Sequence, residues 1–130
     1  MSSPVTLRTK KEIFQQILTQ LGRDVPDIYA SVLVRQDGLL ITSNLPTDVD
    51  GRKVAAISAA IATIGIRAVN ELKQGKIKQV IVSADEGQII TMGIENLFIS
   101  VLVSKDANLG YALLELENVA EELKEVLGGR

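Results

Sequence analysis

The sequence predicts an α+β sandwich: a five-stranded antiparallel sheet with one long central helix on one face and two terminal helices on the other. Three observations predict it. Five short runs rich in β-branched residues surround one long helical pattern and lie between two others. Short turns join successive strands, which favours antiparallel pairing. The terminal helices are apolar on one side only, as expected of helices that cover a single face of a sheet.

The first helix is predicted to begin at Thr9 and to end near Gly22. The run Thr9-Lys10-Lys11-Glu12 matches a capping box, in which the threonine and glutamate side chains each bind a free backbone N–H. Apolar residues then recur at helical spacing as far as Leu21, and glycine commonly follows a helix end. This pattern indicates an amphipathic helix of about three turns.

A β-hairpin is predicted next, with strands over residues 28–35 and 39–43. Both runs are rich in branched apolar residues, which favour strands. Between them, Gln36-Asp37-Gly38 is typical of a tight turn, because aspartate and glycine tolerate positive φ. We therefore expect these strands to be antiparallel neighbours.

The central helix is expected to follow a loop that contains Pro46. Asp48 or Asp50 can cap its first turn, and the apolar pattern continues to about Lys73. Gly75 is predicted to end it.

Three more strands and a last helix complete the pattern. The strands are predicted over residues 77–84, 88–93 and 97–103, joined by turns at 85–87 and 95–96. Asp106 or Asn108 is expected to cap the last helix, and Gly128-Gly129 to end it.

The central helix is more apolar around its circumference than a helix covering one sheet needs to be. Its apolar region spans about 220°, whereas a stripe somewhat over 100° wide suffices. We expect a bulky arc to pack on the sheet: Val54, Ile57, Ile61, Ile64, Ala68 and Leu72. We expect a smaller arc to allow close approach of a second helix: Ala55, Ser58, Ala59, Ala62, Gly65, Ile66 and Val69.

Two partners could cover the small arc. Another helix of the same chain is the simpler one, since a helix apolar nearly all round can simply be buried. The terminal helices, however, have ordinary one-sided patterns that the other face of the sheet satisfies. We therefore predict that a second copy of the chain covers it.

The strand after the central helix supports self-association. Residues 76–82 read KIKQVIV, and lysines among apolar residues are typical of an edge strand. Such a strand can remain solvated, or it can pair with its symmetric copy and bring two central helices together. The predicted interface on this strand is Ile77, Lys78, Gln79, Val80 and Ile81.

Composition narrows the function. The 130 residues suit one domain, expected over 9–127 with a flexible N-terminus (1–8) and a short tail (128–130). The chain has no cysteine and no histidine, which excludes thiolate and imidazole chemistry. A net charge of −2 and a 3% aromatic content disfavour nucleic-acid binding.

The expected location is the cytoplasm. The N-terminal residues show no secretion signal, and the most apolar stretch, 54–69, is shorter than the roughly 20 residues that a spanning helix needs. We therefore expect no membrane insertion.

No catalytic or metal site is predicted. Gly75-Lys76 lacks the preceding glycine and the strand–loop–helix order of a phosphate-binding loop. Asp85-Glu86 lies in a predicted turn, and the glutamates of the last helix lie on its polar side. Arg67 could pair with an acidic partner, although exposure to solvent is the simpler reading. We expect neither a cofactor nor an enzymatic activity.

The order of elements and several local patterns resemble the roadblock / dynein light-chain family, whose fold is profilin-like. The resemblance extends from about Thr9 to Leu127. It is carried by residues 32–41 (VLVRQDGLLI), the alanine-rich helix 54–72, 79–82 (QVIV), 87–90 (GQII) and Asn108-Leu109-Gly110.

This resemblance implies homodimers built from central helices and third-strand edges. It also implies a partner, because proteins of this family bind and regulate small Ras-like GTPases, act as scaffold subunits or attach to motor complexes. The chain is most similar to the single-domain prokaryotic type, which includes a bacterial polarity regulator that acts on its GTPase as a dimer. The resemblance implies no catalytic residue.

Three functions follow in order of support. The first is a non-enzymatic homodimeric regulator or scaffold for a small GTPase. The second is a ligand-sensing domain, since Gly65 and Gly93 could leave room near the core. The third is an enzyme that uses carboxylates alone, for which Glu117 and Glu121 are the candidates.

Overall fold

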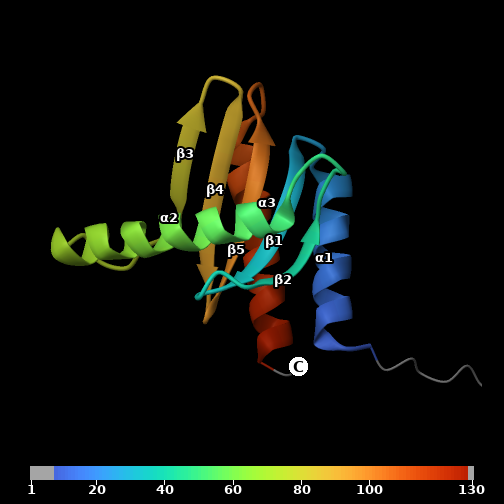
Figure 1. The fold of residues 1–130 in the computed structure, drawn as a ribbon, viewed down its shortest axis with the longest axis horizontal. Helices are drawn as coiled ribbons and strands as arrows, with labels where there is room; N and C mark the ends of the chain where they lie inside the picture. The colour runs from blue at the N-terminus through green and yellow to red at the C-terminus, as the bar shows by residue number, and fades with distance from the viewer. Residues whose placement is uncertain (1–7, 129–130) are drawn as a thin grey trace, which may run out of the picture.

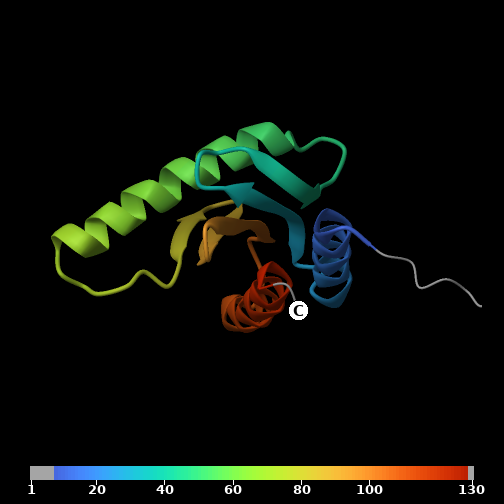
Figure 2. The ribbon, with the colours of Figure 1, turned by 90° about the horizontal axis from the view of Figure 1, so that it is seen from below.

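A computed structural model describes residues 8–128. They form three layers, with α2 on one face of a sheet and α1 and α3 on the other (Figures 1 and 2). The elements are α1 (Lys10–Asp24), β1 (Ile28–Arg35), β2 (Leu40–Asn44), α2 (Gly51–Glu71), β3 (Val80–Ala84), β4 (Gly87–Ile94), β5 (Leu97–Ser104) and α3 (Leu109–Leu127). Apart from Arg8 and Gly128, the predicted N-terminus and tail lie outside the described residues.

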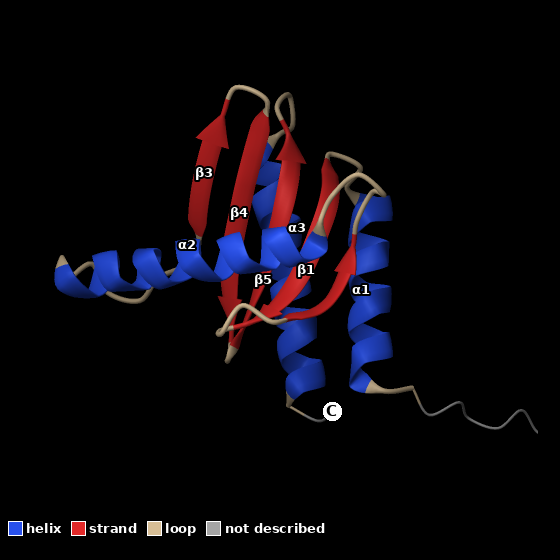
Figure 3. Ribbon diagram, in the orientation of Figure 1, coloured by secondary structure: helices blue, strands red, loops and turns tan. Residues whose placement is uncertain are grey.

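The five strands form one sheet in the order β2-β1-β5-β4-β3, and every neighbouring pair is antiparallel. Strands β2 and β3 are therefore the edges, as Figure 3 shows. This architecture confirms the predicted fold class.

The main hydrophobic core lies between the sheet and the two terminal helices. Leu18 of α1, Leu116 and Leu123 of α3 and Ile99 of β5 are completely buried there. Both terminal helices thus bury their single apolar side against the same face of the sheet, as their sequence patterns predict.

Helix α1 begins as predicted but continues beyond Gly22. The capping box is complete, and the hydrogen bonds from the Thr9 backbone and side chain lower the pKa of Glu12. The helix ends at Asp24, where the N–H of Val25 donates to the carbonyl of Leu21. Gly22 instead allows close packing, since a Cβ there would lie 2.7 Å from Nδ2 of Asn44.

Helix α2 ends before the predicted glycine. Asp50 caps its start, as one of the two expected residues. At its other end Lys73 adopts a positive φ of 55°, and the Gln74 N–H donates to the Val69 carbonyl at 2.8 Å. This is the bonding of a Schellman motif, so Lys73 takes the position expected for Gly75.

Strand β3 begins at Val80 rather than at Ile77. Helix α2 extends past the sheet, and the following segment returns from its far end to the edge (Figure 2). Residues 77–79 therefore approach the sheet instead of pairing with β4. The limits of β2, β4 and β5 differ by about one residue from the prediction.

Candidate protein-interaction surface

The small residues of α2 face the sheet of their own chain. Ala55, Ser58, Ala59 and Ala62 are all buried, and Ala62 is only 3% exposed. Gly65, Ile66 and Val69 are partly buried on the same side of the helix. For the four buried residues the expectation of contact with a second molecule is therefore wrong, whereas for Gly65, Ile66 and Val69 it stays a prediction.

Close packing explains this reversal of the predicted orientation. A Cβ on Gly65 would lie 2.5 Å from Cγ2 of Val80, so only glycine allows the helix to approach β3. On β1, the bulky Val32 and Val34 fill the space against Ala55. The sheet supplies the large side chains of this layer, and the helix supplies the small ones.

The bulky arc of α2 is consequently left exposed, except for Val54, which packs on Val32, Val34 and Ala55 as predicted. Ile64 is 69% exposed, Ile57 is 45% exposed, and Leu72 at the C-cap is 69% exposed. Ala68 is exposed as well, and Ile61 is half-buried. We call Ile57, Ile61, Ile64, Ala68 and Leu72 the outer arc. A contiguous apolar strip of this kind on a helix indicates a protein contact.

The C-terminal end of α2 lies beyond the sheet. In Figures 1 and 2 it projects past β3, so no strand of the same chain lies beneath it. Leu72 of the outer arc is the C-cap at this projecting end, whereas Ile64 directly precedes Gly65, which packs on Val80 of β3. The helix is thus longer than its own sheet can cover.

The sheet has an uncovered apolar area of its own, beside the exposed surface of α2. Val82, Ile89 and Leu102 are directly paired neighbours on β3, β4 and β5. They lie two residues from Val80, Thr91 and Ser100 in the same strands, and therefore on the face that α2 crosses. Val82 is 41% exposed, and Ile89 and Leu102 are half-buried. We call these three residues the uncovered row.

The two edges of the sheet differ in how well they are protected. On β2, Nε2 of Gln15 donates to the Ser43 carbonyl at 2.8 Å, and a register shift interrupts the pairing with β1. On β3, no side chain bonds the backbone of residues 80–84 within the described part of the chain. Strand β3 is the edge that is free to pair.

The five predicted edge residues lie where the sequence suggested, but only two belong to a strand. Val80 and Ile81 open β3 and are half-buried. Ile77, Lys78 and Gln79 precede it; Lys78 is exposed, and the other two are partly buried.

The other candidate sites remain ordinary surface. Arg67 pairs with Glu71 one turn later at 3.4 Å. Glu117 and Glu121 are exposed on α3. Over residues 8–128, no three acidic side chains come together as metal ligands would.

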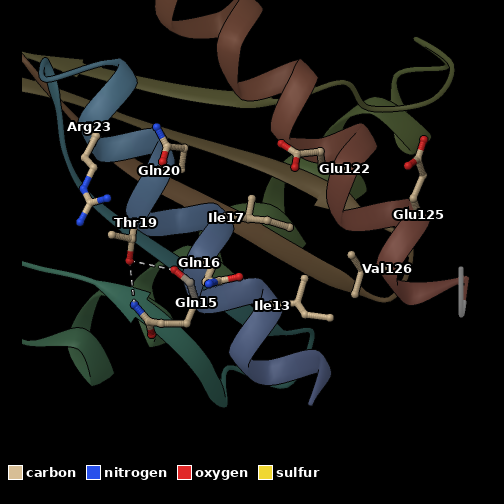
Figure 4. Close-up of a pocket in the computed structure, with 10 residues that line it drawn as sticks. All are labelled: Ile13, Gln15, Gln16, Ile17, Thr19, Gln20, Arg23, Glu122, Glu125 and Val126. Atoms are coloured by element: carbon tan, nitrogen blue, oxygen red, sulfur yellow. Dashed lines mark hydrogen bonds between the residues drawn. The ribbon is translucent and has the colours of Figure 1, made fainter. Parts of the chain in front are cut away.

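A groove of about 640 Å³ separates α1 from α3 (Figure 4). Arg23 and Gln20 lie on its α1 side, and Glu122 and Glu125 lie on its α3 side. Within the described residues no ion pair joins Arg23 to these glutamates. The groove thus shows no convergence of side chains on a reacting atom.

Helix α2 is long and apolar enough to cross a membrane when judged by length and composition alone. It has 21 residues, more than the apolar stretch 54–69 considered in the sequence. Its packing points elsewhere, since one side is buried on the sheet and only the outer arc is both bulky and exposed.

The two apolar arcs of α2 are visible in the sequence, but Ala55, Ser58, Ala59 and Ala62 face the sheet instead of a partner, and Ile57 and Ile64 face away from the sheet. The available signal was the side-chain volume of the strands. Val32, Val34 and Phe98 lie on the face that α2 crosses, and such a face needs small residues on the helix. The uncovered row could not be found this way, because it depends on where α2 crosses the strands.

Relatives of this chain are found in sequence and in structure. An uncharacterised protein of Methanocaldococcus jannaschii is 27% identical over 112 residues, covering 86% of this chain and 97% of the relative.

Two solved structures share the fold. Myxococcus xanthus MglB matches with a TM-score of 0.85 at 15% identity, over 96% of this chain and 95% of that one. A Roadblock/LC7 domain from Streptomyces avermitilis matches with a TM-score of 0.81 at 19% identity, over 87% of this chain and 96% of that one. The Roadblock/LC7 domain family model matches residues 14–104, from α1 to the end of β5. The chain therefore belongs to the Roadblock/LC7 domain family.

Proposed function

We propose that this protein is a non-enzymatic homodimer that binds a small Ras-like GTPase and regulates its nucleotide cycle or its location in the cytoplasm. One observation carries the self-association: the outer arc with the projecting end of α2, the free β3 edge and the uncovered row are all left without a partner by a single chain. Each is apolar or able to form hydrogen bonds. A single symmetric partner could satisfy all three.

The proposed dimer follows from a two-fold axis at the β3 edge. Antiparallel pairing of two β3 strands would join the sheets of both protomers. Helix α2 crosses near the start of β3, because Gly65 packs on Val80. The axis therefore moves the partner's α2 toward the β3–β4 turn, on the same side of the α2 crossing as the uncovered row. The projecting end of each α2 would then lie over the sheet of the other protomer.

This geometry revises the predicted interface. The proposed helical contact uses the outer arc, with Ile57 and Ile64 at its centre, and the sheet-facing Ile66 and Val69 near the projecting end. Ala55, Ser58, Ala59 and Ala62 are not part of it, because they are buried on their own sheet. Val80 and Ile81 are retained as part of β3, together with the uncovered row.

The GTPase is supported by family membership and by the fold shared with MglB. Roadblock/LC7 and MglB-like proteins are regulatory rather than catalytic. The described surface supports a protein partner, because its prominent feature is apolar area on α2 and β3.

The dimer is tested by measuring molar mass at micromolar concentration with size exclusion and light scattering. The wild type should be a dimer. Ile64→Glu should weaken it about a hundredfold or more, because a glutamate in an apolar contact loses its hydration without gaining a partner. Thr63→Glu is the matched control, because Thr63 directly precedes Ile64 and is exposed on the polar side of the helix. A monomeric wild type, or equal effects of both variants, would refute the proposed interface.

The partner is tested with purified Ras-like GTPases from the same organism, loaded with GDP or with a GTP analogue. Binding to one nucleotide state and a changed rate of nucleotide exchange or hydrolysis are expected. Binding without a change of rate would leave a scaffold. Failure with both nucleotide states, using a protein shown to be dimeric, would refute the GTPase assignment alone.

A further inference from the structure

A small cavity lies under α2 at the end of the sheet that carries the β1–β2 and β4–β5 turns. Its volume is about 150 Å³. Apolar side chains from the helix, from the segment before β3 and from the sheet form most of its lining: Ala62, Ile66, Ile77, Val80 and Phe98. A cavity of this size and character holds a molecule about as large as benzene.

Two glycines account for the shape of the cavity. Gly65 brings residues 77–80 close to α2, because any Cβ there would collide with Val80 and Ile77. Gly93 lines the cavity without a side chain, and a Cβ placed on it would meet only Cδ1 of Phe98, at 4.0 Å. Helix α2 and residues 77–80 are packed tightly, while the space over Gly93 is left unfilled.

The hydroxyl groups nearby are already satisfied. Oγ1 of Thr91, which lines the cavity, lies 2.6 Å from Oγ of Ser100 in a buried hydrogen bond. The part of a ligand that enters this space therefore meets no polar group that demands a new partner.

Two of the remaining lining residues carry opposite charges. Lys78 comes from the segment before β3, and Glu95 comes from the β4–β5 turn. Neither forms an ion pair within residues 8–128. Gln36 and Gln79 add amide groups that can donate and accept. The polar lining thus offers one cation and one anion beside a small apolar space.

We propose that this cavity binds a free apolar α-amino acid in its zwitterionic form. The side chain, of the size of leucine or phenylalanine, occupies the space over Gly93. The carboxylate pairs with Lys78, and the ammonium group pairs with Glu95. A ligand with a single charge leaves one of these two residues unpaired, and a larger side chain exceeds the cavity.

This site adjoins the proposed dimer edge, because Val80 lines the cavity and also opens β3. Its turns lie at the opposite end of the sheet from the β3–β4 turn, and on α2 it is lined by Ala62 and Ile66, which are not part of the outer arc. The binding tests are therefore run on the Ile64→Glu variant as well as on the wild type, so that a failure of the proposed dimer and a failure of this site can be told apart.

The first experiment titrates the full chain with L-leucine and L-phenylalanine, followed by calorimetry and by backbone amide NMR. Saturable binding is expected, with shifts at Ala62, Gly93 and Phe98. The single-charge analogues of leucine, 4-methylpentanoate and 3-methylbutylamine, should each bind at least about tenfold more weakly. Glycine should not bind. No saturation by either amino acid up to about 10 mM would overturn the proposal. Equal binding of the carboxylate analogue would overturn the zwitterionic ligand.

The second experiment uses variants. Gly93→Leu should abolish binding by filling the cavity, and Lys78→Gln and Glu95→Gln should each weaken it about tenfold or more. Lys76→Gln and Glu86→Gln are matched controls, since both residues are exposed and neither lines the cavity. Unchanged affinity in Lys78→Gln and Glu95→Gln would overturn the site. Both substitutions are at the surface, so they test the site even where Gly93→Leu does not fold.

Discussion

The two faces of the sheet differ in how completely one chain covers them. On the face that α1 and α3 share, one large cluster includes Leu18, Ile99, Leu116 and Leu123, all with no exposed surface. On the face that α2 crosses, the fully buried cluster consists of Val32, Val34 and Ala55. Two helices protect the first face, whereas a single helix crosses the second and then leaves it.

The difference separates folding from association. We call the face shared by α1 and α3 the completed face, and it contains enough buried apolar area to hold the chain together. The incomplete face leaves apolar groups on α2 and on β3–β5 that one chain does not cover. Stability should therefore respond to changes on the first face at any concentration, and oligomeric state should respond to changes on the second.

The largest effect should come from Ala62→Glu, which tests which side of α2 faces the sheet. Ala62 is buried against its own chain, so an unpaired carboxylate there should cost about 3–5 kcal/mol of folding free energy. Urea unfolding measures this loss. Ala56→Glu is the control, because Ala56 is exposed on the same helix. A folded, monomeric Ala62→Glu protein would mean that the small arc faces a partner after all.

Next in size is Leu116→Ala, which probes the completed face. Removing this fully buried side chain should destabilise the protein by about 2–5 kcal/mol, because a cavity remains in the core. Leu114→Ala makes the same change on the same helix at a side chain that is 55% exposed, and it should have little effect on the urea midpoint. Similar losses for both variants would contradict the one-sided burial of α3.

A smaller effect is expected from Val82→Lys in the uncovered row. The lysine should leave the fold intact and weaken the dimer about tenfold, as measured by analytical ultracentrifugation. Ser83→Lys is the comparison, because the next residue of the strand points to the other face. If Ser83→Lys weakened the dimer more than Val82→Lys, the partner's α2 would not cover this row.

The smallest effect should be that of Thr9→Ala, which loosens the start of α1 on the completed face. Loss of the cap should lower the melting temperature by about 3–5 °C. Hydrogen bonds from Thr9 hold the pKa of Glu12 below its usual value in the folded protein. This stabilisation is therefore present above the ordinary glutamate pKa and disappears as the pH falls through the lowered one.

The difference in melting temperature between wild type and Thr9→Ala should accordingly be larger at about pH 7 than at about pH 3. A constant difference would show that the carboxylate of Glu12 contributes nothing to the cap.

Much of the fold could be predicted because its signals are local. The capping box at Thr9, the Asp37-Gly38 turn and the cap at Asp50 each act within a few residues. The ends of α1 and α2 were less predictable. Gly22 serves a contact with β2, and Lys73 adopts the conformation expected of a glycine. Gly22 is decided by packing, and Lys73 by the hydrogen bonds that close the helix.

Side-chain identity and helical period are enough to show that α2 carries more apolar surface than one sheet requires. The same local patterns specify the elements and their antiparallel order. Which arc of α2 packs inward, in contrast, is visible only in the folded chain. That choice depends on the distance between helix and sheet, which the contact of Gly65 with Val80 sets and which no single segment specifies.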